Sequence, residues 1–235
     1  MPMREPQDNL ATLLQVKNAS SDSADLYIYG SIVSSWWGAW HETDQYPESI
    51  KKFLDGAKGK NLNIYINSGG GSVFAGMAIY NMLKRHRGLK TVRVDGLAAS
   101  IASVIALAGD RVIIPSNAYM MVHKPWYWSE GNADDFRKMA AMLDSVQQGL
   151  INAYTEHLKP GVTVETITQM VNDETWMTGD EAGKYFNIEV STPIKAVAYA
   201  GDLKSNKVPK TITESLAAYN ARLKLLKLKG EMSHD

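Results

Sequence analysis

Short segments rich in apolar residues alternate along the chain with longer segments in which apolar residues recur every three or four positions. The short segments predict β-strands, which we expect at 24–33, 61–67, 91–95, 111–115 and 119–123. The longer segments predict amphipathic helices, which we expect at 44–57, 72–83 and 133–158. This alternation of strands and helices is typical of an α/β fold with a largely parallel sheet.

The predicted helix 133–158 is unusually long for the chain, and Asn132 is a suitable N-cap for it. Its apolar residues recur at roughly heptad spacing, and they are Phe136, Met139, Leu143, Val146, Leu150 and Tyr154. One face of this helix must therefore be buried against another surface. We expect the helix to protrude and to pack between subunits.

The two ends of the chain differ from its centre. Residues 1–23 are polar and predict an N-terminal arm, and residues 24–200 contain the alternating pattern of a central domain. Residues 201–235 predict a linker followed by an amphipathic C-terminal helix with one basic side. A solvated cationic face is the favoured interpretation of that side, and a partner-binding tail is the alternative.

Composition narrows the chemistry. The 235 residues include 25 basic and 25 acidic residues and no cysteine. Thiolate nucleophiles, disulfides and cysteine-ligated metals are therefore excluded, and balanced charge gives no general attraction to nucleic acid or to a membrane surface. The first ten residues lack the apolar stretch of a signal peptide, and the longest apolar uncharged run, 97–109, is too short to span a bilayer. We expect a soluble intracellular protein.

The segment 67–72, NSGGGS, lies between a predicted strand and a predicted helix. Its glycines allow positive φ and close approach of another chain, and their N–H groups could hold a phosphate or an oxyanion. A Walker phosphate loop needs a lysine at the start of the helix, and Gly71-Ser72-Val73 has none. Taken alone, the segment is best interpreted as a tight turn.

Ser100 has alanines two positions before and after it, much as a nucleophile elbow has small residues around its serine. A helix N-terminus at this point would stabilise a developing oxyanion. The alternative is a buried alanine-rich helix in which Ser100 and Ser103 bond back to the preceding turn, and the segment alone favours it.

His123 closes an apolar strand before a proline-containing loop, where catalytic groups gather in α/β sheets, although a lone histidine there is more often structural. Asp173 and Glu174 precede a capping box formed by Thr178 and Glu181, which does not account for them. A carboxylate at either position could orient the second nitrogen of His123. No two histidines stand at ligand spacing, so no metal ion and no cofactor are expected.

Three segments together resemble the family of Clp protease proteolytic subunits (ClpP, peptidase family S14). They are YINSGGGSVFAGMAIYNML (65–83), DGLAASIASVIALAGDRVIIPSNAYMMVHKP (95–125) and ETWMTGDEA (174–182). The resemblance covers about residues 25–195. It implies a crotonase-like (ClpP-like) α/β fold, a spiral of β-β-α units from which a handle helix protrudes. It also implies that residues 24–200 are a serine protease domain that assembles into ring-shaped homo-oligomers.

The resemblance assigns roles to the candidate residues. It implies that Ser100 is the nucleophile, that His123 is its general base, and that the N–H groups of Gly70 and Ile101 form the oxyanion hole. An extended polypeptide substrate is then expected to lie along Gly69 to Gly71 as an added strand.

The resemblance leaves the third member of the triad between two acids. The family usually has Asp there, whereas a gapless match puts Glu174 at the position, with Asp173 one residue earlier as the alternative. The family's usual proline in the glycine-rich turn is replaced by Gly69.

The same segments look most like the Clp-like proteases of phages and prophages, which implies processing of capsid or scaffold protein in the bacterial host cytoplasm. Docking of an AAA+ unfoldase is not expected, because the N-terminal arm differs from that of housekeeping ClpP. The alternatives are a housekeeping-like ClpP that degrades unfolded proteins with such an unfoldase, a crotonase-fold acyl-CoA enzyme, and a catalytically silent scaffold protein.

Overall fold

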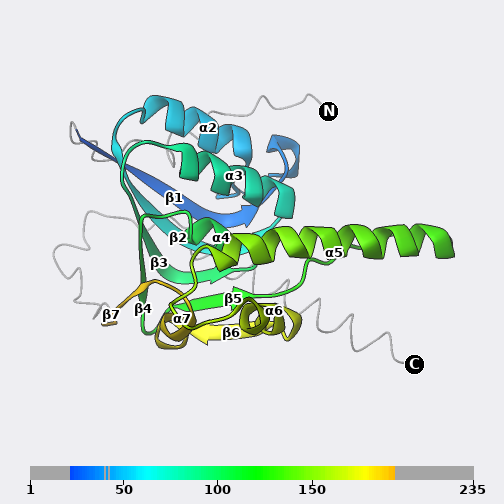
Figure 1. The fold of residues 1–235 in the computed structure, drawn as a ribbon. Coiled ribbons are helices and arrows are strands. Elements are labelled where there is room, and N and C mark those ends of the chain that lie inside the picture. Colours follow the sequence, from blue (N-terminus) through cyan, green and yellow to red (C-terminus); the bar gives the residue numbers. More distant parts are fainter. Residues whose placement is uncertain (1–21, 40, 42, 194–235) are drawn as a thin grey trace, which may run out of the picture. The chain divides into compact units, whose positions relative to one another are not determined.

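The computed structural model describes residues 22–39, 41 and 43–193, which Figure 1 shows in colour. Most of the predicted N-terminal arm lies outside these residues. The end of the predicted central domain, 194–200, and the predicted linker and basic helix, 201–235, also lie outside them.

The described residues form one seven-stranded mixed sheet that includes every strand predicted from the sequence. Its main path runs β1-β2-β3-β4-β7, and β5 pairs with β3 and with β6. All pairings are parallel except that of β5 with β6, so the expectation of a largely parallel sheet is confirmed. The strands are β1 (Ser23–Ile32), β2 (Asn61–Gly71), β3 (Lys90–Ala99), β4 (Arg111–Pro115), β5 (Tyr119–Val122), β6 (Thr175–Thr178) and β7 (Glu189–Ser191).

The helices of the described residues agree with the predicted ones and add others. They are α2 (Pro47–Gly56), α3 (Val73–Arg85), α4 (Ile101–Ala106), α5 (Ala133–Thr155), α6 (Val164–Asn172) and α7 (Gly179–Tyr185), besides a 3₁₀ turn, η1 (Trp36–Gly38). Asn132 caps α5, and Thr178 with Glu181 forms a capping box on α7, as the sequence predicts. Helix α6 and strands β6 and β7 were not predicted.

The interpretation of 67–72 as a tight turn is wrong. Strand β2 continues through the glycines, where Ser31 and Ile32 of β1 pair with Gly70 and Gly71. The reason is that these residues are still held between two neighbouring strands, since Ser68 pairs with Ala98 of β3. The chain turns into α3 only at Ser72, whose side chain accepts a hydrogen bond from the N–H of Ala75.

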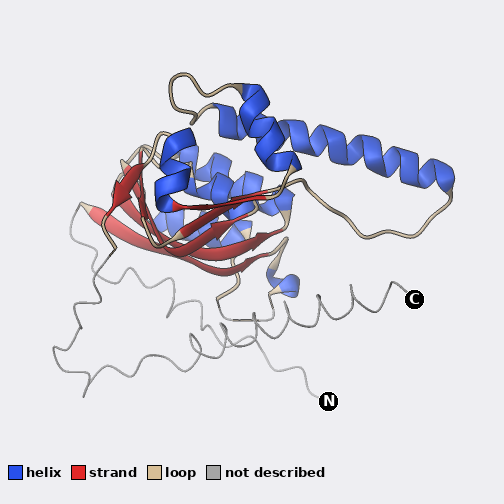
Figure 2. Cartoon of the chain, turned by 90° about the horizontal axis from the view of Figure 1, so that it is seen from below, coloured by secondary structure: helices blue, strands red, loops and turns tan. Residues whose placement is uncertain are grey.

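The core lies between the sheet and the helices on one of its faces (Figure 2). Alternate residues of β2 are buried, because successive side chains of a strand point to opposite faces of the sheet. Leu62, Ile64 and Ile66 of β2 are almost fully buried, and so are Ile79 and Leu83 of α3. Burial of each such side chain contributes about 1.5–3 kcal/mol to folding.

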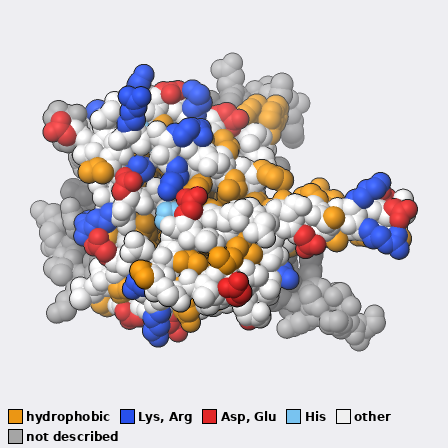
Figure 3. All heavy atoms as spheres, viewed as in Figure 1, with side chains coloured by type: hydrophobic (Ala, Val, Ile, Leu, Met, Phe, Trp, Pro, Cys, Tyr) orange, Lys and Arg blue, Asp and Glu red, His pale blue; other side chains and the backbone are white. Residues whose placement is uncertain are grey.

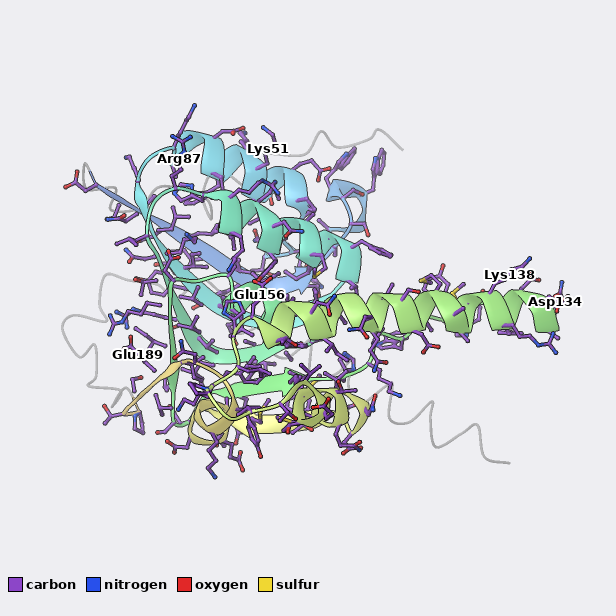
Figure 4. All side chains as sticks on the ribbon, viewed as in Figure 1. Lys51, Arg87, Asp134, Lys138, Glu156 and Glu189 are labelled. Carbon is purple, nitrogen blue, oxygen red and sulfur yellow. The ribbon has the colours of Figure 1, made fainter. Side chains whose placement is uncertain are left out.

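Helix α5 extends away from the core for most of its length (Figure 1). Its buried residues, Leu150, Ile151, Ala153 and Tyr154, all lie near its C-terminal end. Charged side chains gather at its other end (Figure 3), where Figure 4 labels Asp134 and Lys138. The predicted apolar stripe therefore has a partner within the described residues only at the base of the helix. None of the described helices combines the length and apolar character that crossing a membrane requires.

Candidate active site

Ser100 occupies the sharp turn between β3 and α4. Its backbone has a φ of 56° and a ψ of −132°, a conformation that costs about 1–3 kcal/mol for a residue with a side chain. Two hydrogen bonds hold the turn: the N–H of Ser100 donates to the carbonyl oxygen of Met121 over 2.9 Å, and its carbonyl oxygen accepts from the N–H of Ser103 over 3.0 Å. A serine presented on such a strand-to-helix turn has the geometry of a nucleophile elbow.

Gly70 lies directly against this turn. A Cβ atom added to Gly70 would be 2.8 Å from the Cβ of Ser100 and 3.1 Å from the backbone nitrogen of Ile101. The φ of Gly70 is 88°, which also disfavours any side chain. The glycine-rich end of β2 thus allows its backbone to approach Ser100 closely.

Strand β5 positions His123 beside Ser100. Ala98 and Ala99 of β3 pair in parallel with Met120 and Met121 of β5, so the residues that follow the two strands leave the sheet side by side. The Nε2 of His123 lies 2.8 Å from the Oγ of Ser100. In the tautomer that carries its proton on Nδ1, Nε2 accepts a hydrogen bond from the serine hydroxyl.

The surroundings of His123 favour its neutral, unprotonated form, which can accept a proton. Burial lowers the pKa of the imidazole, and the nearby negative charge of Glu174 opposes that shift without cancelling it. The ring is therefore mostly neutral at neutral pH. A neutral imidazole hydrogen-bonded to a serine hydroxyl is able to take its proton.

The antiparallel pairing of β5 and β6 places Glu174 across from His123. Val122 pairs with Thr175, so continuing the register by one residue sets Glu174 opposite His123. Glu174 has a φ of 50°, one of the two positive values found among the described residues other than glycine. Its Oε1 accepts a hydrogen bond of 3.4 Å from Nε1 of Trp176.

Asp173, the alternative acid, is held on α6. It is the C-cap of that helix, and both of its carboxylate oxygens accept hydrogen bonds of 2.9 Å from Nε2 of Gln169. Among the described residues, neither acid forms a hydrogen bond with His123. The structure therefore brings Ser100 and His123 into contact and Glu174 into their electrostatic range, while Asp173 is engaged elsewhere.

The two expected donors of the oxyanion hole are close together but differ in their present partners. Ile101 is the first residue of α4, and the first N–H groups of a helix have no acceptor within the helix. The N–H of Gly70 donates to the Oγ of Ser68 over 3.1 Å. Gly70 therefore has to share its hydrogen bond, or exchange it, to bind an oxyanion.

Gly69 to Gly71 offer only one edge to an added strand. On the other edge, Gly71 packs against the backbone of Ile32, and the N–H of Ser72 donates to the carbonyl oxygen of Ile32 over 2.7 Å. An extended peptide paired with this segment would therefore lie on the side of the turn that carries Ser100.

Sequence reasoning missed the contact of Trp176 with Glu174. The sequence carried no clear signal of it, because Glu174 precedes β6 and has a positive φ, so the two-residue period of a strand does not extend to it. The alternative interpretation of the serines is correct for Ser103, whose Oγ donates to the carbonyl oxygen of Ser100 over 2.6 Å. It is not correct for Ser100, which precedes the helix. No cluster of three or more metal-ligating side chains occurs within the described ranges.

Comparison with known proteins gives a consistent result. The model of the family described as Clp protease matches residues 48–189. A protein of Bacteroides fragilis named ATP-dependent Clp protease proteolytic subunit is 32% identical over 134 residues, which cover 56% of this chain and 63% of the relative. A protein of the same name from Porphyromonas gingivalis is 34% identical over 142 residues, which cover 58% of this chain and 62% of the relative. The chain thus spans roughly three-fifths of the length of these relatives.

The matched range includes the turn at Ser100, the end of β5 at His123 and both candidate acids. It also includes all six α-helices of the described residues except the first residue of α2. These elements form the ClpP-like fold, in which a mixed sheet carries a long projecting helix. Because the match extends over more than half of the 235 residues, the chain belongs to the Clp protease family.

Proposed function

We propose that the protein is a serine endopeptidase of the Clp type. The observation that carries this proposal is the 2.8 Å contact between Oγ of Ser100 and Nε2 of His123, made at a strained turn with an alanine two positions before and two positions after the serine. A merely structural serine does not need positive φ, and strain of this kind is concentrated at functional sites. Membership of the family supports the same chemistry.

In this mechanism Ser100 Oγ attacks the carbonyl carbon of a peptide bond while its proton passes to Nε2 of His123. The carbonyl oxygen becomes an oxyanion beside the N–H groups of Ile101 and Gly70. When the C–N bond breaks, His123 returns the proton to the leaving amine. Water then attacks the acyl-enzyme, with His123 again accepting and returning a proton, and the free carboxylic acid leaves Ser100.

Glu174 is the acid that we propose as the third member. Its charge already raises the pKa of His123 against the effect of burial, which is the influence expected of a group that stabilises the imidazolium. A carboxylate hydrogen-bonded to Nδ1 of His123 would form by turning the side chain from Trp176. Hydrogen bonds of catalytic groups are often long in the absence of substrate and shorten in the complex.

Labelling with a fluorophosphonate tests the proposal. We expect stoichiometric modification of the full-length protein, abolished in Ser100→Ala and strongly slowed in His123→Ala. Ser145→Ala, a matched change on the exposed part of α5, should label as the parent does. Absence of labelling in a folded parent would contradict the protease, and would favour an acyl-CoA enzyme that uses the glycine N–H groups or a silent scaffold protein.

For the substrate we propose capsid or scaffold protein of a prophage, cleaved in the host cytoplasm without an AAA+ unfoldase. The resemblance of 65–83, 95–125 and 174–182 to phage proteases supports this choice. The names of the relatives, which contain the words ATP-dependent, favour the housekeeping alternative.

The two substrate hypotheses differ in their need for ATP. We expect the purified protein to cleave the head protein encoded beside it without nucleotide, and Ser100→Ala to abolish the cleavage. Co-purification of an unfoldase, together with degradation of an unfolded protein only when ATP is present, would favour the housekeeping alternative.

We also propose that the subunits form a ring-shaped homo-oligomer through α5, because most of that helix is not buried against any of the described residues of its own subunit. The division into an N-terminal arm (1–23), a protease domain (24–200) and a linker with a basic C-terminal helix (201–235) remains part of the proposal. Its support is the change in composition at those positions.

A further inference from the structure

Two fully buried hydroxyl groups form a chain that ends on the backbone of Ser100. The Oγ of Ser103, in α4, lies 2.6 Å from the carbonyl oxygen of Ser100 and 2.7 Å from the hydroxyl of Tyr154, in α5. Ser103 is 0% exposed and Tyr154 is 1% exposed. The mechanism proposed above uses neither side chain.

The direction of the hydrogen bonds in this chain follows from the groups involved. A carbonyl oxygen only accepts, so the single hydroxyl proton of Ser103 is donated to Ser100. The hydroxyl of Tyr154 must then donate to the Oγ of Ser103. Burial raises the pKa of Tyr154 well above its usual range, so that the phenol keeps the proton it donates.

The bonded carbonyl group belongs to the same peptide unit as a candidate oxyanion donor. The C=O of Ser100 and the N–H of Ile101 lie in one plane, because the peptide bond between them does not rotate freely. Fixing the oxygen therefore fixes the direction of the N–H on the opposite side of the plane. Successive hydrogen bonds also polarise one another, which makes the N–H a better donor.

We propose that Ser103 and Tyr154 are positioning residues for the oxyanion hole: they hold the Ser100–Ile101 peptide so that the N–H of Ile101 points at the developing oxyanion. This inference rests on the proposed serine peptidase mechanism. Because Tyr154 lies at the base of α5, it also ties the orientation of the oxyanion donor to the seating of the projecting helix. The positive φ of Ser100 makes such support necessary, since a strained turn persists only where its surroundings hold it.

Kinetics of two single variants and their combination test the inference. We expect Tyr154→Phe to lower kcat on a short fluorogenic peptide on the order of three- to ten-fold, which is the net effect of one hydrogen bond, with little change in KM. Ser103→Ala should lower kcat at least as much. In the double variant Tyr154→Phe should have no further effect, because its hydroxyl acts only through Ser103.

The affinity of a peptide boronate distinguishes positioning of the oxyanion donor from a purely structural role. Its tetrahedral adduct on Ser100 places an oxygen in the oxyanion hole, so its affinity should fall by about the same factor as kcat in each variant. Equal losses of kcat and of boronate affinity across the series support positioning. Unchanged boronate affinity alongside reduced kcat would contradict it.

Tyr80→Phe is the matched control. Tyr80 is another buried tyrosine, 4% exposed, and its hydroxyl donates to Glu156 just beyond α5 over 3.1 Å rather than to Ser103. Figure 4 labels Glu156 at that end of the helix. Tyr80→Phe should retain the parental kcat and boronate affinity. A loss equal to that of Tyr154→Phe, accompanied by an equal fall in Tm, would overturn the inference in favour of general destabilisation.

Crystal structures of the parent and both tyrosine variants judge the inference without any activity. We expect the Ser100–Ile101 peptide plane to be turned in Tyr154→Phe and unchanged in Tyr80→Phe. An unmoved plane in Tyr154→Phe, with parental kcat, would refute the positioning role. A parent that neither cleaves peptides nor labels at Ser100 would instead contradict the proposed function, whatever the position of the plane.

Discussion

At the scale of single residues, the candidate site depends on backbone conformations that side chains disfavour. Ser100 and Glu174 both have positive φ. Ser100 directly follows β3 and Glu174 directly precedes β6, and both strands pair with β5, which ends just before His123. His123 is kept neutral by burial, and the charge of Glu174 partly offsets this effect. The balance of these two influences sets the pH range in which the histidine can act as a base.

The pH profile of Glu174→Gln tests that balance. The pKa of His123 lies below its ordinary value of 6.5, so kcat/KM of the parent should rise with pH along an acid limb below that value. Glu174 raises this pKa, and removing its charge should shift the acid limb to still lower pH while lowering the plateau. The measurement is kcat/KM against pH.

Asp173→Asn is the matched control, because its carboxylate is bonded to Gln169 rather than to His123. It should keep both the plateau and the acid limb of the parent. A large loss in Asp173→Asn with none in Glu174→Gln would show that the acids have the opposite roles.

Gly70→Ala tests the close approach of β2 to Ser100. The added Cβ would lie 2.7 Å from the carbonyl oxygen of Ala99 and 2.8 Å from the Cβ of Ser100. We expect loss of labelling at Ser100 and a decrease of about 1–3 kcal/mol in the free energy of unfolding. Gly56→Ala, at the end of α2, meets no atom within 4 Å and should change neither quantity by much. Full labelling of Gly70→Ala would contradict the packing described for this turn.

At the scale of elements, the short strands β5 and β6 pair with neighbouring strands, whereas most of the long helix α5 has no packing partner within the described residues. The strands are stabilised by hydrogen bonds to neighbouring strands, and β5 lies between β3 and β6. Phe136, near the start of α5, is 51% exposed. A helix with an apolar stripe of this kind gains its stability by packing against a partner.

The double variant Phe136→Glu/Leu143→Glu tests whether α5 mediates assembly. The two residues are seven positions apart and share one stripe, so charges there should prevent burial of the helix in an interface. We expect the sedimentation coefficient to fall to that of a smaller species, while the circular dichroism of the subunit remains close to that of the parent.

Ser145→Glu is the matched control, since position 145 lies on the opposite side of the helix from Phe136, nine residues and about 180° away. It should assemble as the parent does. If both variants assembled normally, α5 would not be the element that joins subunits.

At the scale of the whole molecule, one buried charge connects the beginnings of two adjacent strands. The Nζ of Lys90, at the start of β3, lies 2.9 Å from Oδ2 of Asp110, just before β4, and the lysine side chain is 6% exposed. Burial acts to raise the pKa of Asp110, but its hydrogen bonds and charge interaction with Lys90 outweigh this effect and lower it. The pair therefore contributes to the stability of the folded state.

Asp110→Asn should lower the free energy of unfolding at neutral pH by about 1–3 kcal/mol, because it leaves a buried ammonium group without its carboxylate. A carboxyl group whose pKa is lower in the folded than in the unfolded state stabilises the folded protein at any pH above its unfolded-state pKa. That contribution is lost as the pH falls through its folded-state pKa. The difference in free energy of unfolding between Asp110→Asn and the parent should therefore become smaller well below pH 3.8, which is the ordinary pKa of an aspartate side chain.

The measurement is the free energy of unfolding from denaturant titrations, made once at neutral pH and once well below pH 3.8. Asp55→Asn, which disrupts the exposed pair of Asp55 with Lys51, is expected to change stability by less than 1 kcal/mol. An Asp110→Asn effect as small as this control would contradict the role given to the buried lysine.

The sequence by itself determined the elements that depend on local pattern. Alternating and helical periodicities predicted β1 to β5, α2, α3 and α5, because burial of one face imposes that periodicity wherever an element is long enough to repeat it. It failed for helix α6 and for β6 and β7, two short strands that lack the continuous apolar run by which the similarly short β5 was found. It also ended β2 too early, because glycines usually signal a turn unless two neighbouring strands hold them.

Only the tertiary structure decided which residues meet. Taken alone, the glycine-rich segment, Ser100 and His123 each had a structural interpretation that was at least as good as the functional one. Three paired residues between β3 and β5 bring Ser100 to His123, and the four pairs between β5 and β6, continued by one residue, set Glu174 rather than Asp173 across from His123. The chain of Tyr154, Ser103 and Ser100 likewise joins residues 51 and 3 positions apart. Local pattern records the burial of each segment, but strand register and the seating of a helix are set by contacts between segments, and these exist only in the folded chain.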